Sequence, residues 1–372
     1  MKNSFGQSLT VTLFGESHGP YIGAVLDGLA PGMEVDEEFI RHQLFLRRPS
    51  GKISTARVEQ DEYTLASGVF RGRTTGTPLS ILIPNTVQRS TDYEDKPRIA
   101  RPGHADYTAS EKYHGFEDFR GGGHFSGRIT AAIVAAGAIV IPALAKKGIE
   151  IGTHIKRCGG ITDRDFGDYH EDIKALAAAG FPVLDETASA DMLKMMEKTA
   201  AEGDSVGGIL ETVVTGMPAG VGEPWFDTVE GLLAHAMYSI PAIKGVQFGD
   251  AFAMVESRGS EYNDAIRIKD GKVVTKTNHN GGINGGITNG MPILFSCAVK
   301  PTPSIYKQQE SIDLKSREET TLQITGRHDP AIIHRARVVA DSMTALTLYD
   351  ILAGRYGTDY FCSALVPGKE NK

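Results

Sequence analysis

The sequence predicts an α+β sandwich that folds as one integrated domain over residues 1–372. Runs of alternating, β-branched residues are separated by long stretches with helical spacing, in a similar order in both halves of the chain. Hydrophobic residues make up 41% of the chain and charged residues 23%, which is typical of a protein with a sizeable core. No Ser/Gly/Pro-rich linker or acidic tail divides the sequence, so two separable domains are disfavoured.

Four segments have the spacing and end signals of helices. Residues 130–147 are apolar on every side, which predicts a central, fully enclosed helix. Residues 185–202 combine Met and Leu with charges at helical spacing, and a glycine follows directly. Residues 227–237 begin with an acceptor-then-Glu pattern typical of a capping box. The fourth predicted helix covers residues 335–352.

The predicted strands lie between these helices. Alternating runs bounded by glycine or proline occur at residues 8–14, 207–215, 251–255 and 291–299. Glycine accounts for 43 of the 372 residues, and it gathers in short clusters beside polar and charged side chains. Such clusters occur where the backbone turns sharply or approaches a ligand closely, so they indicate anion-binding loops.

Charge and cysteine content exclude several classes of protein. The net charge of −7 is the opposite of the basic footprint of a nucleic-acid binder. Cys158, Cys297 and Cys362 lie far apart without CxxC spacing, so we expect no disulfide framework, no thiolate metal site and a reducing, cytoplasmic location. The N-terminus has no apolar region typical of a secretory signal. The uncharged run at 129–145 is alanine-rich and short, so we interpret it as a buried helix rather than a membrane span.

The first dense group of reactive side chains directly follows a predicted strand. Residues 15–19 read Gly-Glu-Ser-His-Gly, and a turn of this kind exposes its side chains. His18 could act as a general acid, because an imidazole gains or loses a proton near neutral pH. Taken alone, the pattern is better explained by a plain turn whose histidine bonds a backbone carbonyl, so a catalytic role needs support from other segments.

A second group places arginines and glycines just before the enclosed helix. Residues 101–107 read Arg-Pro-Gly-His-Ala-Asp-Tyr, and residues 120–128 read Arg-Gly-Gly-Gly-His-Phe-Ser-Gly-Arg. Backbone N–H groups at a helix N-terminus attract phosphate, and guanidinium groups bind its oxygens in pairs. A phosphorylated ligand is therefore predicted. The alternative is that each arginine is an ordinary surface charge paired with a nearby carboxylate.

Nucleotide-binding signatures are missing from the triglycine segment. It carries neither G-x-G-x-x-G after a strand nor the lysine of a P-loop, which disfavours a kinase or a Rossmann dehydrogenase. The C-terminal half adds polar, glycine-rich segments at 278–286, 300–304 and 326–330 that could line the other side of a pocket. Asp329 could accept a proton there, although an Asp before Pro is as often a plain turn residue.

Together these segments resemble the chorismate synthase family. The matching stretches keep the family's order and span nearly the whole chain: 15–19, 101–107, 120–123, 216–224, 244–250, 278–286, 300–302 and 326–330. The resemblance implies a β-α-β sandwich with long central helices between antiparallel sheets. It also implies a lyase that removes phosphate and a ring hydrogen from 5-enolpyruvylshikimate 3-phosphate in a trans-1,4 elimination, giving chorismate. Reduced FMN would assist by lending an electron and recovering it, without net redox change.

The resemblance assigns roles to particular positions. His18 would protonate the departing phosphate, His104 would hold a proton near the flavin, and Asp329 would move the proton of the flavin N5. The positions implied for binding the substrate anion are Arg48, Arg101, Arg128 and Arg327. The positions implied for binding the cofactor are Ser126, Ala242, Gly285, Lys300, Pro301, Thr302, Pro303, Ser304, Arg327 and Arg47, with Arg47 the candidate contact for NADPH as reductant. A homotetramer without nucleic-acid or membrane partners is also implied.

Two departures from the family pattern affect the flavin site. His124 and Phe125 stand where the family commonly has Arg-Ser, and Pro241 stands where it has Asn. These changes keep a second hypothesis open, in which a phosphometabolite- or flavin-binding protein has lost turnover. A third hypothesis is a flavin oxidoreductase, which would consume a reductant stoichiometrically.

Overall fold

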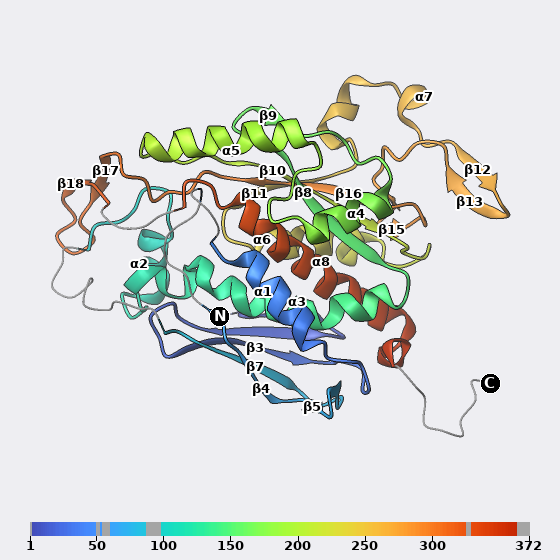
Figure 1. Cartoon of the computed structure of the whole chain (residues 1–372), viewed down its shortest axis with the longest axis horizontal. Helices are drawn as coiled ribbons and strands as arrows, with labels where there is room; N and C mark the ends of the chain where they lie inside the picture. Colours follow the sequence, from blue (N-terminus) through green and yellow to red (C-terminus); the bar gives the residue numbers. More distant parts are fainter. Residues whose placement is uncertain (1, 50–52, 54–59, 87–97, 325–328, 363–372) are drawn as a thin grey trace.

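Two five-stranded antiparallel sheets and a set of long helices form the protein, as shown by a computed structural model (Figure 1). The structure describes residues 2–49, 53, 60–86, 98–324 and 329–362. The first sheet has the order β1 (Ser4–Phe5), β2 (Thr10–Gly15), β3 (Tyr21–Asp27), β7 (Leu79–Pro84) and β4 (Thr64–Ser67). The second has the order β11 (Ile243–Phe248), β16 (Ile293–Val299), β10 (Gly208–Thr215), β8 (Glu150–Cys158) and β9 (Ile161–Thr162).

Three helices lie between the sheets in Figure 1: α1 (Glu37–Arg47), α3 (Thr130–Ala145) and α8 (Ile333–Tyr356). Helix α3 contacts β3 and β7 on one side and β8 on the other, and α8 contacts β8 and β10. The two helices cross where a Cβ on Gly137 would lie 2.3 Å from the Cβ of Ser342, so only glycine permits this approach. One hydrophobic cluster runs through both sheets and these helices, and the α+β class is confirmed.

Five α-helices remain in the described part of the chain, and Figure 1 shows the last of them projecting away from this core beside the hairpin of residues 266–275. They are α2 (Asp106–Tyr113), α4 (Tyr169–Ala178), α5 (Glu186–Ala201), α6 (Val229–Tyr238) and α7 (Gly259–Tyr262). Short hairpins pair β5 (Val69–Phe70) with β6 (Arg73–Thr74), β12 (Ile266–Lys269) with β13 (Lys272–Thr275), β14 (Ile283–Asn284) with β15 (Ile287–Thr288), and β17 (Gln309–Ile312) with β18 (Glu319–Leu322). In Figure 1, α5 lies on the outer side of the second sheet.

The four predicted helices are confirmed, with shifted ends. Helix α6 begins one residue later than its capping pattern indicated, because the hydroxyl of Thr228 accepts from the N–H of Gly231 at 2.9 Å. Helix α8 is longer than predicted at both ends. The apolar stretch Gly127–Ala145 is long enough to cross a membrane, but 78% of its apolar window is buried, as in the core helix of a soluble fold.

Three of the predicted strands are confirmed, and one prediction is wrong. Residues 8–14, 207–215 and 291–299 correspond to β2, β10 and β16, whereas residues 251–255 lie in the 3₁₀ helix Ala251–Glu256. The chain leaves the second sheet at Gly249, whose φ is +53°. Phe252 and Val255 are therefore 79% and 75% exposed, and their alternation covers no sheet face. Helices α1, α2, α4 and α7 were not predicted.

Candidate active site

The His18 turn connects β2 to β3 and depends on Gly15. The strands pair up to Gly15 and Ile22, so residues 16–20 must reverse the chain within a few residues. Gly15 has a φ of +95°, and a Cβ there would lie 2.2 Å from the carbonyl oxygen of Tyr21. Ser17 and His18 are consequently turned inward and are 1% and 6% exposed. The histidine is part of the interior rather than a surface turn.

The triglycine segment packs directly on this turn. The N–H of Ser17 donates to the carbonyl oxygen of Gly123 at 3.1 Å, and the Ser17 hydroxyl donates to that of Arg120 at 3.1 Å. The Nδ1–H of His124 donates to the carbonyl oxygen of Gly15 at 2.8 Å. The His124 side chain therefore helps to hold the His18 turn in place.

Adjacent glycines of this segment contact the two predicted catalytic histidines. A Cβ on Gly121 would lie 2.5 Å from Nε2 of His18, and a Cβ on Gly122 would lie 3.4 Å from Nε2 of His104. Both glycines have positive φ, +59° and +90°. The missing side chains and the left-handed backbone thus bring two imidazoles, 86 residues apart in sequence, to one short piece of chain.

Asp106 orients the imidazole of His104. Its carboxylate accepts from Nδ1–H of His104 at 2.7 Å, which leaves Nε2 for the side facing Gly122. Arg101 donates to the same carboxylate from Nε and Nη2, both at 2.7 Å. Burial alone would raise the pKa of Asp106, but the hydrogen bonds from Arg101 and His104 outweigh burial and hold it well below its usual range. The carboxylate is therefore ionised when it holds His104.

Two arginines predicted for the site, one for substrate and one for cofactor, share a buried carboxylate. Arg47 donates to Asp61 at 2.9 Å, Arg128 pairs with the other oxygen of the same carboxylate, and the side chain of Asp61 is 0% exposed. Burial opposes ionisation of Asp61, yet the two guanidinium groups lower its pKa overall. Asp61 also has a φ of +50°, a conformation that a non-glycine residue rarely adopts.

Asn85 links this pair to the His18 turn. Its side-chain oxygen accepts from Nε of Arg128 at 3.0 Å, and its amide nitrogen donates to the carbonyl oxygens of Glu16 and Gly19. On the far side of Arg47, Arg335 donates from Nε to the carbonyl oxygen of Arg47 at 2.8 Å and pairs with Asp329. Asp329 is therefore connected to the backbone of Arg47 through Arg335.

The segment 300–304 approaches from the second sheet. Nζ of Lys300 donates to the carbonyl oxygen of Gly103, and Pro303 packs near Gly103 as well. The N–H of Lys300 donates to the carbonyl oxygen of Ala242 at 2.9 Å. Thr302 has a buried hydroxyl oxygen with no hydrogen-bond partner among the described residues.

Most of the predicted site residues thus lie in one continuous network of contacts. It includes His18, His104, Arg101, Arg128, Arg47, Asp329, Ala242, Lys300 and Pro303. Ser126 caps the turn before α3 by accepting from the N–H of Arg128, and Ser304 is buried. Arg48, at the end of α1, donates to Gln60 at 3.4 Å.

One predicted position lies elsewhere. Gly285 is in the β14–β15 hairpin, where the carbonyl oxygen of the next residue, Gly286, accepts from the N–H of Val229. In Figure 1 this hairpin and α2, which follows His104, lie at opposite ends of the molecule. Arg327 lies outside the described residues.

Sequence reasoning missed three members of the network. Asp106 stands two residues after His104, so a search for imidazole–carboxylate pairs could have found it. Asp61 and Asn85 gave no local signal, because they are separated from Arg128 by 67 and 43 positions in sequence.

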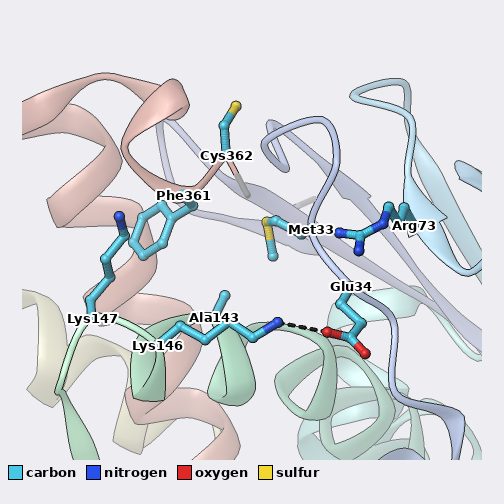
Figure 2. A pocket seen from close by; sticks show the side chains of 8 residues that line it. All are labelled: Met33, Glu34, Arg73, Ala143, Lys146, Lys147, Phe361 and Cys362. Atoms are coloured by element: carbon cyan, nitrogen blue, oxygen red, sulfur yellow. Dashed lines mark hydrogen bonds and ion pairs between the residues drawn. The ribbon is translucent and has the colours of Figure 1, made fainter. Parts of the chain in front are cut away.

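A cavity of about 320 Å³ lies at the other end of α3 (Figure 2). Its lining contains Met33, Glu34, Arg73, Ala143, Lys146, Lys147, Phe361 and Cys362, and Lys146 pairs with Glu34 at 2.8 Å. None of these eight residues is a histidine or belongs to the network around His18. A smaller cavity, about 10 Å³, lies beside His104 and Gly122. The larger hollow is therefore separate from the reactive groups.

Buried arginines, two imidazoles beside adjacent glycines and a loop that carries Lys300 are the kinds of group that an enzyme uses to handle an anionic substrate. Among the described residues, no group of three or more His, Cys, Asp or Glu side chains could hold a metal ion. Asp61, Asp106 and Asp329 each pair with an arginine of the site, so the site holds both anions and cations.

Comparisons with known proteins agree with this class. The family model of chorismate synthase matches residues 9–353. Chorismate synthases of Pyrococcus abyssi and Thermococcus kodakarensis are 46% and 44% identical to the chain, over 94% of its length and 97% of theirs. A crystal structure of chorismate synthase matches with a TM-score of 0.75 at 28% identity, covering 95% of this chain and 94% of that one.

The chain belongs to the chorismate synthase family. It is a lyase that eliminates phosphate from 5-enolpyruvylshikimate 3-phosphate to give chorismate, in the shikimate pathway of aromatic amino acid biosynthesis. The family implies a reduced flavin as cofactor.

Proposed function

We propose that the network around His18 and His104 is the catalytic site of the phosphate elimination. The observation that carries this proposal is the contact of both imidazoles with the adjacent glycines Gly121 and Gly122. His18 protonates the departing phosphate, and His104, whose Nδ1–H donates to Asp106, accepts and returns a proton at Nε2 on the side facing Gly122. Asp329 accepts a proton on the side of α8.

The arginines bind the negative charges of the substrate. Arg101 and Arg128 are held by carboxylates of the chain, and Arg48 and Arg327 complete the set that we assign to substrate. Each fixed carboxylate keeps its guanidinium in place before the substrate arrives, which reduces the reorganisation that binding requires. Two arginines on Asp61 leave a net positive charge, so an anion is still attracted.

The residues present fit a reduced flavin. The buried Thr302 hydroxyl, which has no hydrogen-bond partner in the described part of the chain, can bond a polar ligand atom, and the Lys300 ammonium beside Gly103 suits an anionic one. We assign FMN to Ser126, Ala242, Lys300, Pro301, Thr302, Pro303, Ser304, Arg327 and Arg47, and we leave out Gly285, which lies in the distant β14–β15 hairpin. A reduced flavin held by these residues would supply a transient electron that helps expel the phosphate. The chain positions the substrate, excludes water and supplies protons.

We also infer that the order of layers is the predicted β-α-β sandwich, that residues 1–372 form one domain, and that the enzyme works as a cytoplasmic homotetramer without nucleic-acid or membrane partners. Support for assembly comes from exposed apolar groups: Trp225 and Phe226 are 85% and 96% exposed, and Ile266 and Ile268 of β12 are 68% and 70% exposed. Light scattering after size-exclusion chromatography measures the mass of the assembly, and a monomer at micromolar concentration would contradict this inference.

The test of the catalytic assignment is anaerobic turnover of the enolpyruvyl substrate with chemically reduced FMN, followed by chorismate absorbance. His18→Ala and His104→Ala should each lower turnover by roughly 10²–10⁴-fold if the imidazoles act as proton donors. Rates close to the unaltered enzyme would make the histidines structural. Bound ligands without any product would favour the binding-protein hypothesis, and stoichiometric consumption of reductant would favour the oxidoreductase.

The same assay with NADPH and oxidised FMN replacing the reduced flavin tests whether the enzyme reduces its own cofactor. We assign Arg47 as the NADPH contact in that case. Chorismate formation only with chemically reduced FMN would remove NADPH from the reaction.

A further inference from the structure

Asn85 lies at the junction between the first sheet and the catalytic turn. It directly follows β7, and its N–H donates to the carbonyl oxygen of Pro20 at 3.1 Å, which extends the pairing of β7 with β3. The residue is 7% exposed. Its side chain therefore has a fixed starting point beside the turn that carries His18.

All the hydrogen-bonding groups of the Asn85 amide are directed at the site. Nδ2 donates to the carbonyl oxygens of Glu16 at 2.9 Å and Gly19 at 2.8 Å, one on each side of His18 in sequence. Oδ1 accepts from Nε of Arg128 at 3.0 Å. Only a primary amide supplies two donors and one acceptor from so short a side chain. An aspartate here would lose both donors, and an apolar side chain would lose all three bonds.

The partner on the other side, Arg128, is held independently of Asn85. It pairs with the buried carboxylate of Asp61 and donates from Nη2 to the carbonyl oxygen of Pro84 at 3.1 Å. The position of the Arg128 guanidinium is therefore fixed by other contacts, and the amide of Asn85 connects it to the His18 turn.

We propose that Asn85 is a positioning residue that holds the His18 turn at a fixed place relative to Arg128, so that the imidazole and the guanidinium meet the same phosphate group. This inference rests on the proposed roles of His18 and Arg128. Because Arg128 keeps its other partners without Asn85, loss of the amide acts mainly on the histidine, and it lowers kcat more than it changes KM.

The test is a double-mutant cycle of Asn85→Ala and His18→Ala, assayed by anaerobic chorismate formation with reduced FMN. We expect Asn85→Ala to lower kcat about 10–100-fold with less than a threefold change in KM. In the His18→Ala background the same change should lower kcat less than threefold, because its effect passes through the imidazole. Asn85→Asp has nearly the same shape and keeps an acceptor for Arg128, and it should behave like Asn85→Ala because both donors are lost.

Thr74→Val is the matched control. Thr74 is also buried in the first sheet and bonds two backbone groups, the N–H of Met33 and the carbonyl oxygen of Ala30, away from His18. Thr74→Val should lower the melting temperature without the loss of kcat expected for Asn85→Ala. If Asn85→Ala lowers kcat equally in the unaltered enzyme and in the His18→Ala variant, and His18→Ala is itself slow, this inference is wrong while the catalytic assignment of His18 stands. Full activity of His18→Ala overturns both this inference and the catalytic assignment. If Asn85→Ala does not fold, the cycle with Asn85→Asp decides between the same outcomes.

Discussion

Substitution of Gly121 by alanine tests whether the triglycine segment exists to seat the catalytic imidazole. The new Cβ would lie 2.5 Å from Nε2 of the buried His18, whereas carbon atoms in good contact lie about 3.5–4.0 Å apart. The imidazole or the turn must therefore move by about 1 Å, and a displacement of that size lowers turnover about 10²-fold. The left-handed φ of +59° adds about 1–2 kcal/mol of lost stability.

Gly148→Ala separates the two effects. Gly148 follows the other end of α3 with a φ of +77°, and a Cβ there would meet nothing within 4 Å. The Gly148→Ala substitution should lower the free energy of unfolding by about as much as the left-handed φ costs in Gly121→Ala, and it should leave kcat unchanged. The measurements are urea unfolding and anaerobic chorismate formation for both variants. Full activity of Gly121→Ala, or an equal loss of kcat in Gly148→Ala, would refute the reasoning.

Three other substitutions probe charged groups of the fold. Asp61→Asn leaves two buried guanidinium groups without their counter-ion, so the free energy of unfolding in urea should fall by about 3–5 kcal/mol. Inorganic phosphate should raise the melting temperature of this variant more than that of the unaltered enzyme, and equal increases would contradict the prediction. Asp106→Asn removes the ion that orients His104, and kcat should fall roughly 10–100-fold with little change in KM; an unchanged kcat would leave Asp106 with a structural role. Burial opposes protonation of His154, but two carboxylates bound to its ring nitrogens raise its pKa above the ordinary ~6.5, so its stabilising charge is present below that pH and is lost as pH rises through the raised value. The melting temperature of His154→Gln should therefore fall most near pH ~6 and less near pH ~9, and a deficit that does not change with pH would be evidence against the charge.

Patterns within one element predicted much of the fold. The apolar residues of 130–147 gave the central helix, because a helix that is apolar on every side has to be enclosed. Alternation gave β2, β10 and β16, whereas the same alternation at 251–255 misled, because no sheet face lies beside that segment. Hydrophobic periodicity shows which side chains are stabilised by burial. It carries no information on whether another element of the fold is present to bury them.

For the reactive groups too, some features could be predicted from the sequence and others could not. The glycine-flanked turn at His18 and the Arg-Pro-Gly-His segment at His104 were visible as sequence motifs, and the order of such motifs gave the family. The contact of the two histidines with adjacent glycines was not visible, since a positive φ and a missing side chain have meaning only when a neighbour fills the space.

The sequence alone therefore determined the α+β class, the central helices and the residue types of the site. Only the tertiary structure decided that Asp61 joins Arg47 to Arg128, that Asn85 connects Arg128 to the His18 turn, and that Gly285 lies away from both. Hydrophobic periodicity is a local property of the chain, so it can be read in order. Ion pairs and hydrogen bonds between distant residues depend on how the sheets and helices are stacked, because these interactions act over a few ångströms of space and not along the chain.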